Sequence, residues 1–101
     1  MTLNFLVANA AIYHPIDIDE LRISAEDSAL TLKTNLNSTI YFIKSFLPLL
    51  AEDGRVVIVS SSYGHFNFQN IEFKNILTDP NLTEETILLL SKSYSEAVAK
   101  N

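Results

Sequence analysis

Residues 55–64 read Arg-Val-Val-Ile-Val-Ser-Ser-Ser-Tyr-Gly, and this stretch decides the fold. The unbroken β-branched run Val56–Val59 is typical of a strand that is covered on both faces. In open α/β sheets, ligands lie in the crevice beyond the carboxyl ends of the strands, so the hydroxyls that follow are predicted to face a substrate or cofactor. The alternative is that Ser60, Ser61 and Ser62 only satisfy backbone groups where the strand turns into a loop.

The composition indicates at most one globular domain. The chain has 101 residues, a net charge of -5 and 48% hydrophobic residues, unlike a disordered or membrane segment. It holds no cysteine, which excludes disulfides and thiolate chemistry. Seven Lys and Arg stand against twelve Asp and Glu, which argues against a surface for nucleic acid or for an anionic membrane.

The sequence also lacks the features of a membrane or secretory segment, of a glycine-rich phosphate loop and of a calcium loop. No apolar run approaches the roughly 20 residues of a membrane helix, and no basic segment precedes the first apolar run, so we expect a cytoplasmic protein. With only two glycines, the chain cannot form a glycine-rich phosphate loop. A predicted surface loop over residues 12–23 carries Asp17, Asp19 and Glu20, but it lacks the glycine and terminal glutamate of a calcium loop, so no metal site is predicted.

A strand and a long helix are predicted before residue 55. Leu3–Ala8 is short and apolar, and predicts a first buried strand. Ser24 is the predicted N-cap of a helix that runs to about Ala51, because two acidic residues follow in the first turn. Pro48 is expected to loosen the last turn before Asp53-Gly54 ends the helix. Apolar residues recur along this helix at steps of three and four, at Leu32, Leu36, Ile40, Ile43, Leu47 and Leu50.

Two shorter helices are predicted after residue 64. Ile71–Leu77 is a candidate for a short helix within a mixed segment. Thr83 is a clearer start signal, since Glu84 and Glu85 follow it in the first turn, and this helix is predicted to run to about Ala99.

The order strand, long helix, strand predicts a right-handed β-α-β unit with parallel strands, and hence the α/β class. Two parallel strands cannot cover their own faces, and sheets of this type are buried on both faces by further elements. The sequence therefore predicts the middle of a larger α/β domain.

Three stretches in this order resemble the short-chain dehydrogenase/reductase family. Residues 6–12, Leu-Val-Ala-Asn-Ala-Ala-Ile, are similar to the family's Asn-Asn-Ala-Gly motif at the end of its fourth strand. Residues 33–39, Lys-Thr-Asn-Leu-Asn-Ser-Thr, are similar to the segment of its fourth helix that carries an asparagine, and residues 54–64 look like its fifth strand and catalytic serine. The tail from residue 81 resembles the helical insertion of the carbonyl reductase subgroup.

The resemblance implies a partial Rossmann-like, doubly wound fold, in which residues 1–101 are the central fragment of a single NAD(P)-binding domain. It implies NADPH as cofactor, and an aldehyde or ketone as the small-molecule substrate. By motif position, Ser61 is the serine that orients the substrate carbonyl, and Asn35 is the asparagine that positions a water in the proton relay. Asn9, Ala10 and Ala11 occupy the strand-end motif beside the cofactor.

The chain also departs from the family pattern. No glycine-rich turn precedes the first strand, and no Tyr-x-x-x-Lys pair follows the serine. Ala8 stands where the strand-end motif has its first Asn, and Ala11 where it has Gly, which alters the local hydrogen bonds and the backbone approach there. The chain thus carries two of the family's four catalytic positions, and we expect no activity from it alone.

Two alternatives stay open. One is a truncated, non-catalytic product that acts by protein association through the helix face around Tyr41, Phe42 and Phe46 and through the open strand edges. The other is a complete small α/β binding domain of an unrelated family. His14 and His65 show no metal or triad spacing and are assigned to loops. Tyr63 directly follows the serines and either lines the mouth of the site or only packs at the turn.

Overall fold

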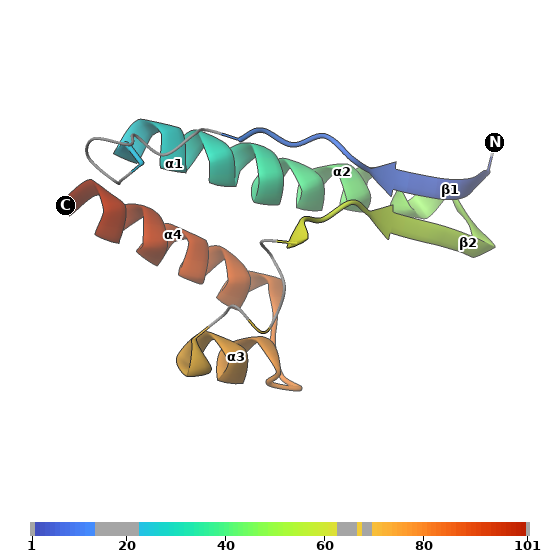
Figure 1. Cartoon of the computed structure of the whole chain (residues 1–101). Helices are drawn as coiled ribbons and strands as arrows, with labels where there is room; N and C mark the ends of the chain where they lie inside the picture. Colours follow the sequence, from blue (N-terminus) through green and yellow to red (C-terminus); the bar gives the residue numbers. More distant parts are fainter. Residues whose placement is uncertain (1, 14–22, 63–66, 68–69, 101) are drawn as a thin grey trace.

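The computed structural model describes residues 2–13, 23–62, 67 and 70–100 of the chain. His14, Asp17, Asp19, Glu20, Tyr63 and His65, which the sequence analysis discussed, lie outside these residues. Figure 1 shows two strands at one end of an elongated molecule and the helices extending from them. In chain order, the elements are β1 (Leu3–Ala8), α1 (Ala25–Leu32), a π-helical segment (Lys33–Asn37), α2 (Ser38–Phe46), a 3-10 turn (Leu47–Leu49), β2 (Leu50–Ile58), α3 (Ile71–Leu77) and α4 (Glu84–Lys100).

The two strands pair in parallel, which confirms the predicted β-α-β unit. Leu6 lies opposite Val56 and Ala8 opposite Ile58, and the ladder continues where the Val59 N–H donates to the Ala8 carbonyl at 2.9 Å. Near its start the register shifts, because β1 advances from Leu3 to Phe5 while β2 advances from Leu50 to Arg55. The strand β2 is therefore longer and less regular than the β-branched run alone predicted.

The long helix ends earlier than predicted. It was expected to reach about Ala51, with Asp53-Gly54 as its end, but all three residues belong to β2. Pro48 lies within the 3-10 turn, and the next residue but one, Leu50, already has an extended backbone with φ -72° and ψ 135°. Proline loosens the last turn as expected, and because it cannot donate a helical hydrogen bond, the chain leaves the helix directly into the strand.

Ser24 caps the first helix as predicted. Its backbone is extended, and its side-chain oxygen accepts a hydrogen bond from the Asp27 N–H at 3.0 Å. This bond satisfies one of the amide groups that have no partner within the helix.

Replacing Ser24 with alanine is expected to lower the stability of the chain by about 1 kcal/mol, because the cap is lost. The measurement is the urea midpoint followed by circular dichroism. Ser24→Asp, which can accept the same hydrogen bond, is the matched control and should keep the midpoint. Equal midpoints for Ser24→Ala and the unchanged chain would contradict the capping role.

The C-terminal helices match their predicted positions. The Asn70 side chain caps α3 by accepting from the Phe73 N–H at 2.8 Å, and the Thr83 hydroxyl caps α4 by accepting from the Thr86 N–H at 3.2 Å. Figure 1 shows α4 running back beside α2 and α1. Lys44 on α2 forms a salt bridge with Glu84 at 3.2 Å, although both side chains are exposed and such pairs contribute little stability.

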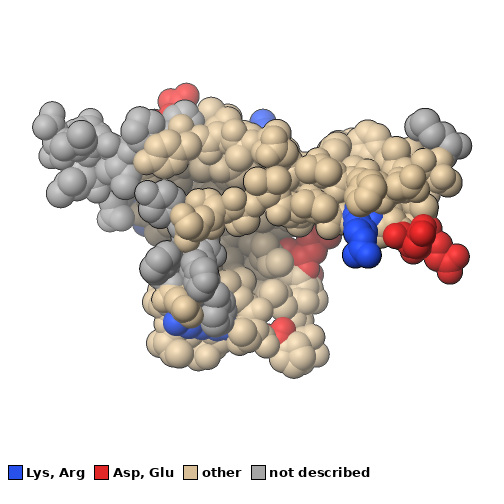
Figure 2. All heavy atoms as spheres, turned by 45° about the vertical axis from the view of Figure 1, so that its right-hand side comes forward, with Lys and Arg blue, Asp and Glu red and all other residues tan. Residues whose placement is uncertain are grey.

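The described core is small and lies between β1 and the long helix. Leu6 and Ala8 are 5% and 8% exposed, whereas Phe5, on the opposite face of β1, is 65% exposed. The run Val56–Val59 was expected to be buried on both faces, but its members are 38% to 59% exposed. Even Ile58, which lies opposite the buried Ala8, is 59% exposed, so neither face of this run is covered. Lys, Arg, Asp and Glu cover little of the face shown in Figure 2.

The accessible surface of the chain is large for its mass, in agreement with a small core. It amounts to 8209 Å², against about 5,700 Å² expected for a folded monomer of this mass. Large apolar side chains such as Phe5, Val57 and Ile58 are part of this exposed surface. Within the described residues, no helix is long and apolar enough to cross a membrane, and no group of three His, Cys, Asp or Glu is placed to hold a metal ion.

Candidate functional site

A cleft of about 340 Å³ lies at the carboxyl ends of β1 and β2. Its volume falls at the lower end of the range of small-molecule sites, about 300–1,000 Å³. The lining includes all five residues that the sequence analysis assigned to the site, namely Asn9, Ala10, Ala11, Asn35 and Ser61. The structure thus brings together three segments that are far apart in the sequence. The rest of the lining is Ala8, Thr39, Ile58, Val59 and Ser60.

The parallel pairing explains this convergence. Because Ala8 lies opposite Ile58, both strands end at the same edge of the sheet, and the residues that follow each strand meet there. Ser60 and Ser61 therefore stand next to the segment after β1. Ser60, Ser61 and residues 9–11 are all exposed, so a ligand in the cleft can reach them.

Asn35 ties the long helix to the loop after β1. Its Oδ1 accepts a hydrogen bond from the Ile12 N–H, and its Nδ2 donates to the Ile12 carbonyl, both at 2.9 Å. Both polar groups of the side chain are thus engaged with the backbone. The carbonyl of Asn35 in turn accepts from the Thr39 hydroxyl at 2.9 Å. The described contacts of the Asn35 side chain hold the wall of the cleft.

A π-helical segment carries Asn35. Lys33–Asn37 separates α1 from α2, and the Lys33 carbonyl accepts both the backbone N–H and the hydroxyl of Ser38. π-helical turns inside α-helices are rare and frequently mark functional sites. A continuous helix was expected here, and the sequence indicated neither this turn nor the part played by Ile12.

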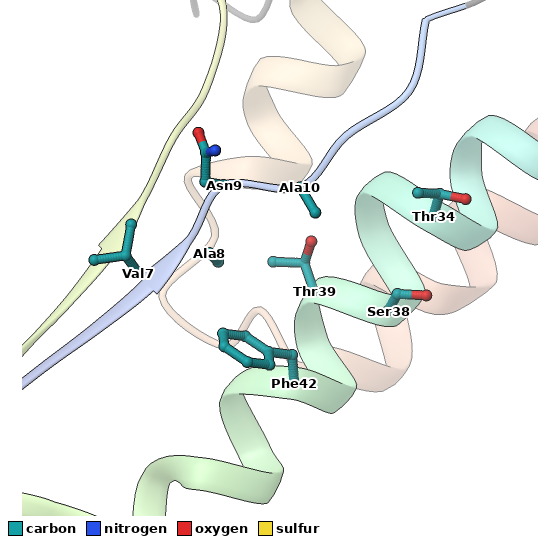
Figure 3. Close-up of a pocket in the computed structure, with 8 residues that line it drawn as sticks. All are labelled: Val7, Ala8, Asn9, Ala10, Thr34, Ser38, Thr39 and Phe42. Atoms are coloured by element: carbon teal, nitrogen blue, oxygen red, sulfur yellow. The ribbon is translucent and has the colours of Figure 1, made fainter. Parts of the chain in front are cut away.

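A second hollow of about 230 Å³ lies beside the cleft, between the end of β1 and α2. Figure 3 shows Thr39 and Phe42 facing the end of β1 from the helix, whereas the side chain of Asn9 points away from this hollow. Ala8, Asn9, Ala10 and Thr39 line both hollows, so the segment after β1 forms the wall between them.

The described lining of the cleft is neutral. It offers hydroxyl and amide groups and small apolar side chains, but no titratable side chain. Such a lining can donate hydrogen bonds to a carbonyl oxygen and can accommodate an uncharged ring, but it cannot supply a proton. It fits the nicotinamide end of a dinucleotide. The glycine-rich turn that would anchor the pyrophosphate does not occur in these 101 residues.

Comparison with known proteins agrees with the geometry. Residues 1–76 match the family model described as enoyl-(acyl carrier protein) reductase. The chain is also 34% identical over 101 residues to carbonyl reductase (NADPH) 1 of Rattus norvegicus. That alignment covers 97% of this chain and 35% of the rat protein, so the chain spans about a third of the length of this relative.

The fold and the matches support one conclusion. The parallel β-α-β unit is a partial Rossmann-like fold, as the sequence predicted, and the alignment with the rat protein covers 97% of the chain. The chain therefore belongs to the short-chain dehydrogenase/reductase family.

Proposed function

We propose that this chain supplies the serine side of the active site of an NADPH-dependent carbonyl reductase, which reduces an aldehyde or ketone in the cytoplasm. The observation that carries the proposal is the shared cleft of Asn9, Asn35 and Ser61, which come from three separate segments. The similarity to a rat protein named for carbonyl reduction with NADPH supports this choice of substrate and cofactor. Residues 1–101 are, on this proposal, the central part of one NAD(P)-binding domain.

Ser61 has the direct chemical role. A neutral hydroxyl at the end of β2 donates a hydrogen bond to the substrate oxygen, which gains negative charge during reduction. Asn35 holds Ile12 and, with it, the cleft wall, and by its motif position it is the asparagine that would position a water in the proton relay. Asn9, Ala10 and Ala11 form the wall against which the nicotinamide end would lie. The bound cofactor supplies the hydride.

The chain cannot complete this reaction by itself. Tyr63 and Tyr94 are followed four residues later by Asn67 and Val98, so neither begins the Tyr-x-x-x-Lys pair that donates the proton in the family. We therefore expect no consumption of NADPH when the purified 101 residues are mixed with a dicarbonyl or quinone substrate.

A chimera tests whether the cleft is functional. This chain replaces the matching third of the rat carbonyl reductase, which restores a cofactor anchor and a proton donor around it. The chimera should bind NADPH and reduce the same substrates. A folded chimera that binds NADPH but reduces none of them would contradict the proposal, and so would reduction by the 101 residues alone.

A second candidate is association with another protein, favoured by the bare sheet face that carries Phe5 and Val57. Size-exclusion chromatography of the 101 residues tests it. A compact folded monomer would contradict this candidate.

A further inference from the structure

Ser38 closes the π-helical turn with two donors. Its backbone N–H and its hydroxyl both donate to the Lys33 carbonyl, the hydroxyl at 2.9 Å. We propose that Ser38 is a positioning residue, whose hydroxyl holds the π-helical turn in the one register that lets Asn35 bind both backbone groups of Ile12.

The span of this bond distinguishes it from other hydroxyl bonds in the described helices. The hydroxyls of Thr31, Thr39 and Ser45 donate to carbonyls four residues back, as is common for Ser and Thr in α-helices. The hydroxyl of Ser38 reaches five residues back, to the carbonyl that the same residue's N–H already binds. It therefore favours the wider turn over the ordinary one.

The register of this turn decides where Asn35 points. An ordinary α-helical turn would join the Asn37 N–H to the Lys33 carbonyl, and removing the extra residue would rotate the helix on one side of it by about 100° relative to the other. The two bonds between Asn35 and Ile12 need both polar groups of one planar amide to meet one backbone residue. Such an arrangement does not survive a rotation of that size.

The consequence reaches the cleft through the backbone. Ile12 directly follows Ala11, which lines the cleft, so the bonds from Asn35 fix the end of the cleft wall. The inference rests on the proposed function only for its effect on catalysis, because the register and the clamp are properties of the chain itself.

Hydrogen exchange in the 101-residue chain, followed by NMR, tests the proposal. The Ile12 amide, which donates to Asn35, reports the clamp, and the Val59 amide, which donates to Ala8, reports the sheet. Ser38→Ala should speed exchange at Ile12 about five-fold, the equilibrium effect of one hydrogen bond, and leave Val59 unchanged. Asn35→Ala should abolish the protection of Ile12.

Two variants serve as controls. Ser38→Thr keeps a hydroxyl on the same carbon and should restore the protection of Ile12. Ser45→Ala removes a hydroxyl bond of the ordinary span from α2 and should leave Ile12 as it is in the unchanged chain.

Three results would overturn the proposal: an unprotected Ile12 amide in the unchanged chain, the same Ile12 exchange in Ser38→Ala as in the unchanged chain, or equal losses at Ile12 and Val59. The last would make Ser38 a residue of general stability. No reduction is measured, so failure here is separate from failure of the proposed function.

Discussion

Ser61→Ala in the chimera with the rat carbonyl reductase is expected to lower kcat about 100- to 1,000-fold, because the variant loses the donor to the oxygen that becomes negatively charged. The KM for the carbonyl substrate should change much less, since the charge develops in the transition state and not in the bound ground state. Steady-state kinetics with a dicarbonyl substrate and saturating NADPH would measure both constants.

Ser62→Ala is the matched control for this variant. Ser62 follows Ser61 directly but is not among the residues that line the cleft. It should leave kcat within a factor of about two, since exposed substitutions away from a site have small effects. Equal losses in the two variants, or full activity in Ser61→Ala, would show that the serines act only in the turn after the strand.

Gly54→Ala is expected to destabilise the fold by about 1–3 kcal/mol, the typical cost of forcing extra atoms into a filled space. A Cβ at this position would lie 2.6 Å from Leu50 Cγ and 2.9 Å from the Ala51 carbonyl oxygen. The second contact is with backbone, which cannot turn aside as the end of a side chain can. The urea midpoint of the chain, followed by circular dichroism, would measure the loss.

Glu52→Ala provides the control for the glycine variant. Glu52 lies in the same irregular part of β2 but is exposed, so its midpoint should stay within about 0.5 kcal/mol of the unchanged chain. If Gly54→Ala unfolds at the same urea concentration as Glu52→Ala, the close approach of Leu50 and Gly54 does not constrain the strand.

Local signals in the sequence predicted most of the elements. Leu3–Ala8 and Ile71–Leu77 were predicted with the bounds that the structure gives them, and the caps at Ser24 and Thr83 were predicted from their residues. Capping and apolar runs act over a few residues, so a single sequence contains the whole cause. The same reasoning failed at the start of β2, because the irregular pairing with β1 depends on a distant strand.

The convergence of the motif residues at one edge of the sheet was predictable, but the contacts that hold them there were not. Family motifs placed Asn9, Asn35 and Ser61 near one another, and the shared cleft shows them together. The partner of Asn35 could not be foreseen, because it is the backbone of Ile12, and any residue type offers the same N–H and carbonyl. The π-helical turn could not be recognised from the sequence either, because the apolar residues on both sides of it still recur at steps of three and four.

The pairing of β1 with β2 has a consequence for the order of folding. Leu6 lies opposite Val56, so the sheet joins positions about fifty residues apart, and bringing the two strands together costs the entropy of closing that loop. Capped helices form from neighbouring residues, whereas such distant pairing is slow. We therefore expect α1, α2 and α4 to gain structure first, so that the cleft at the strand ends is the last part of the chain to mature.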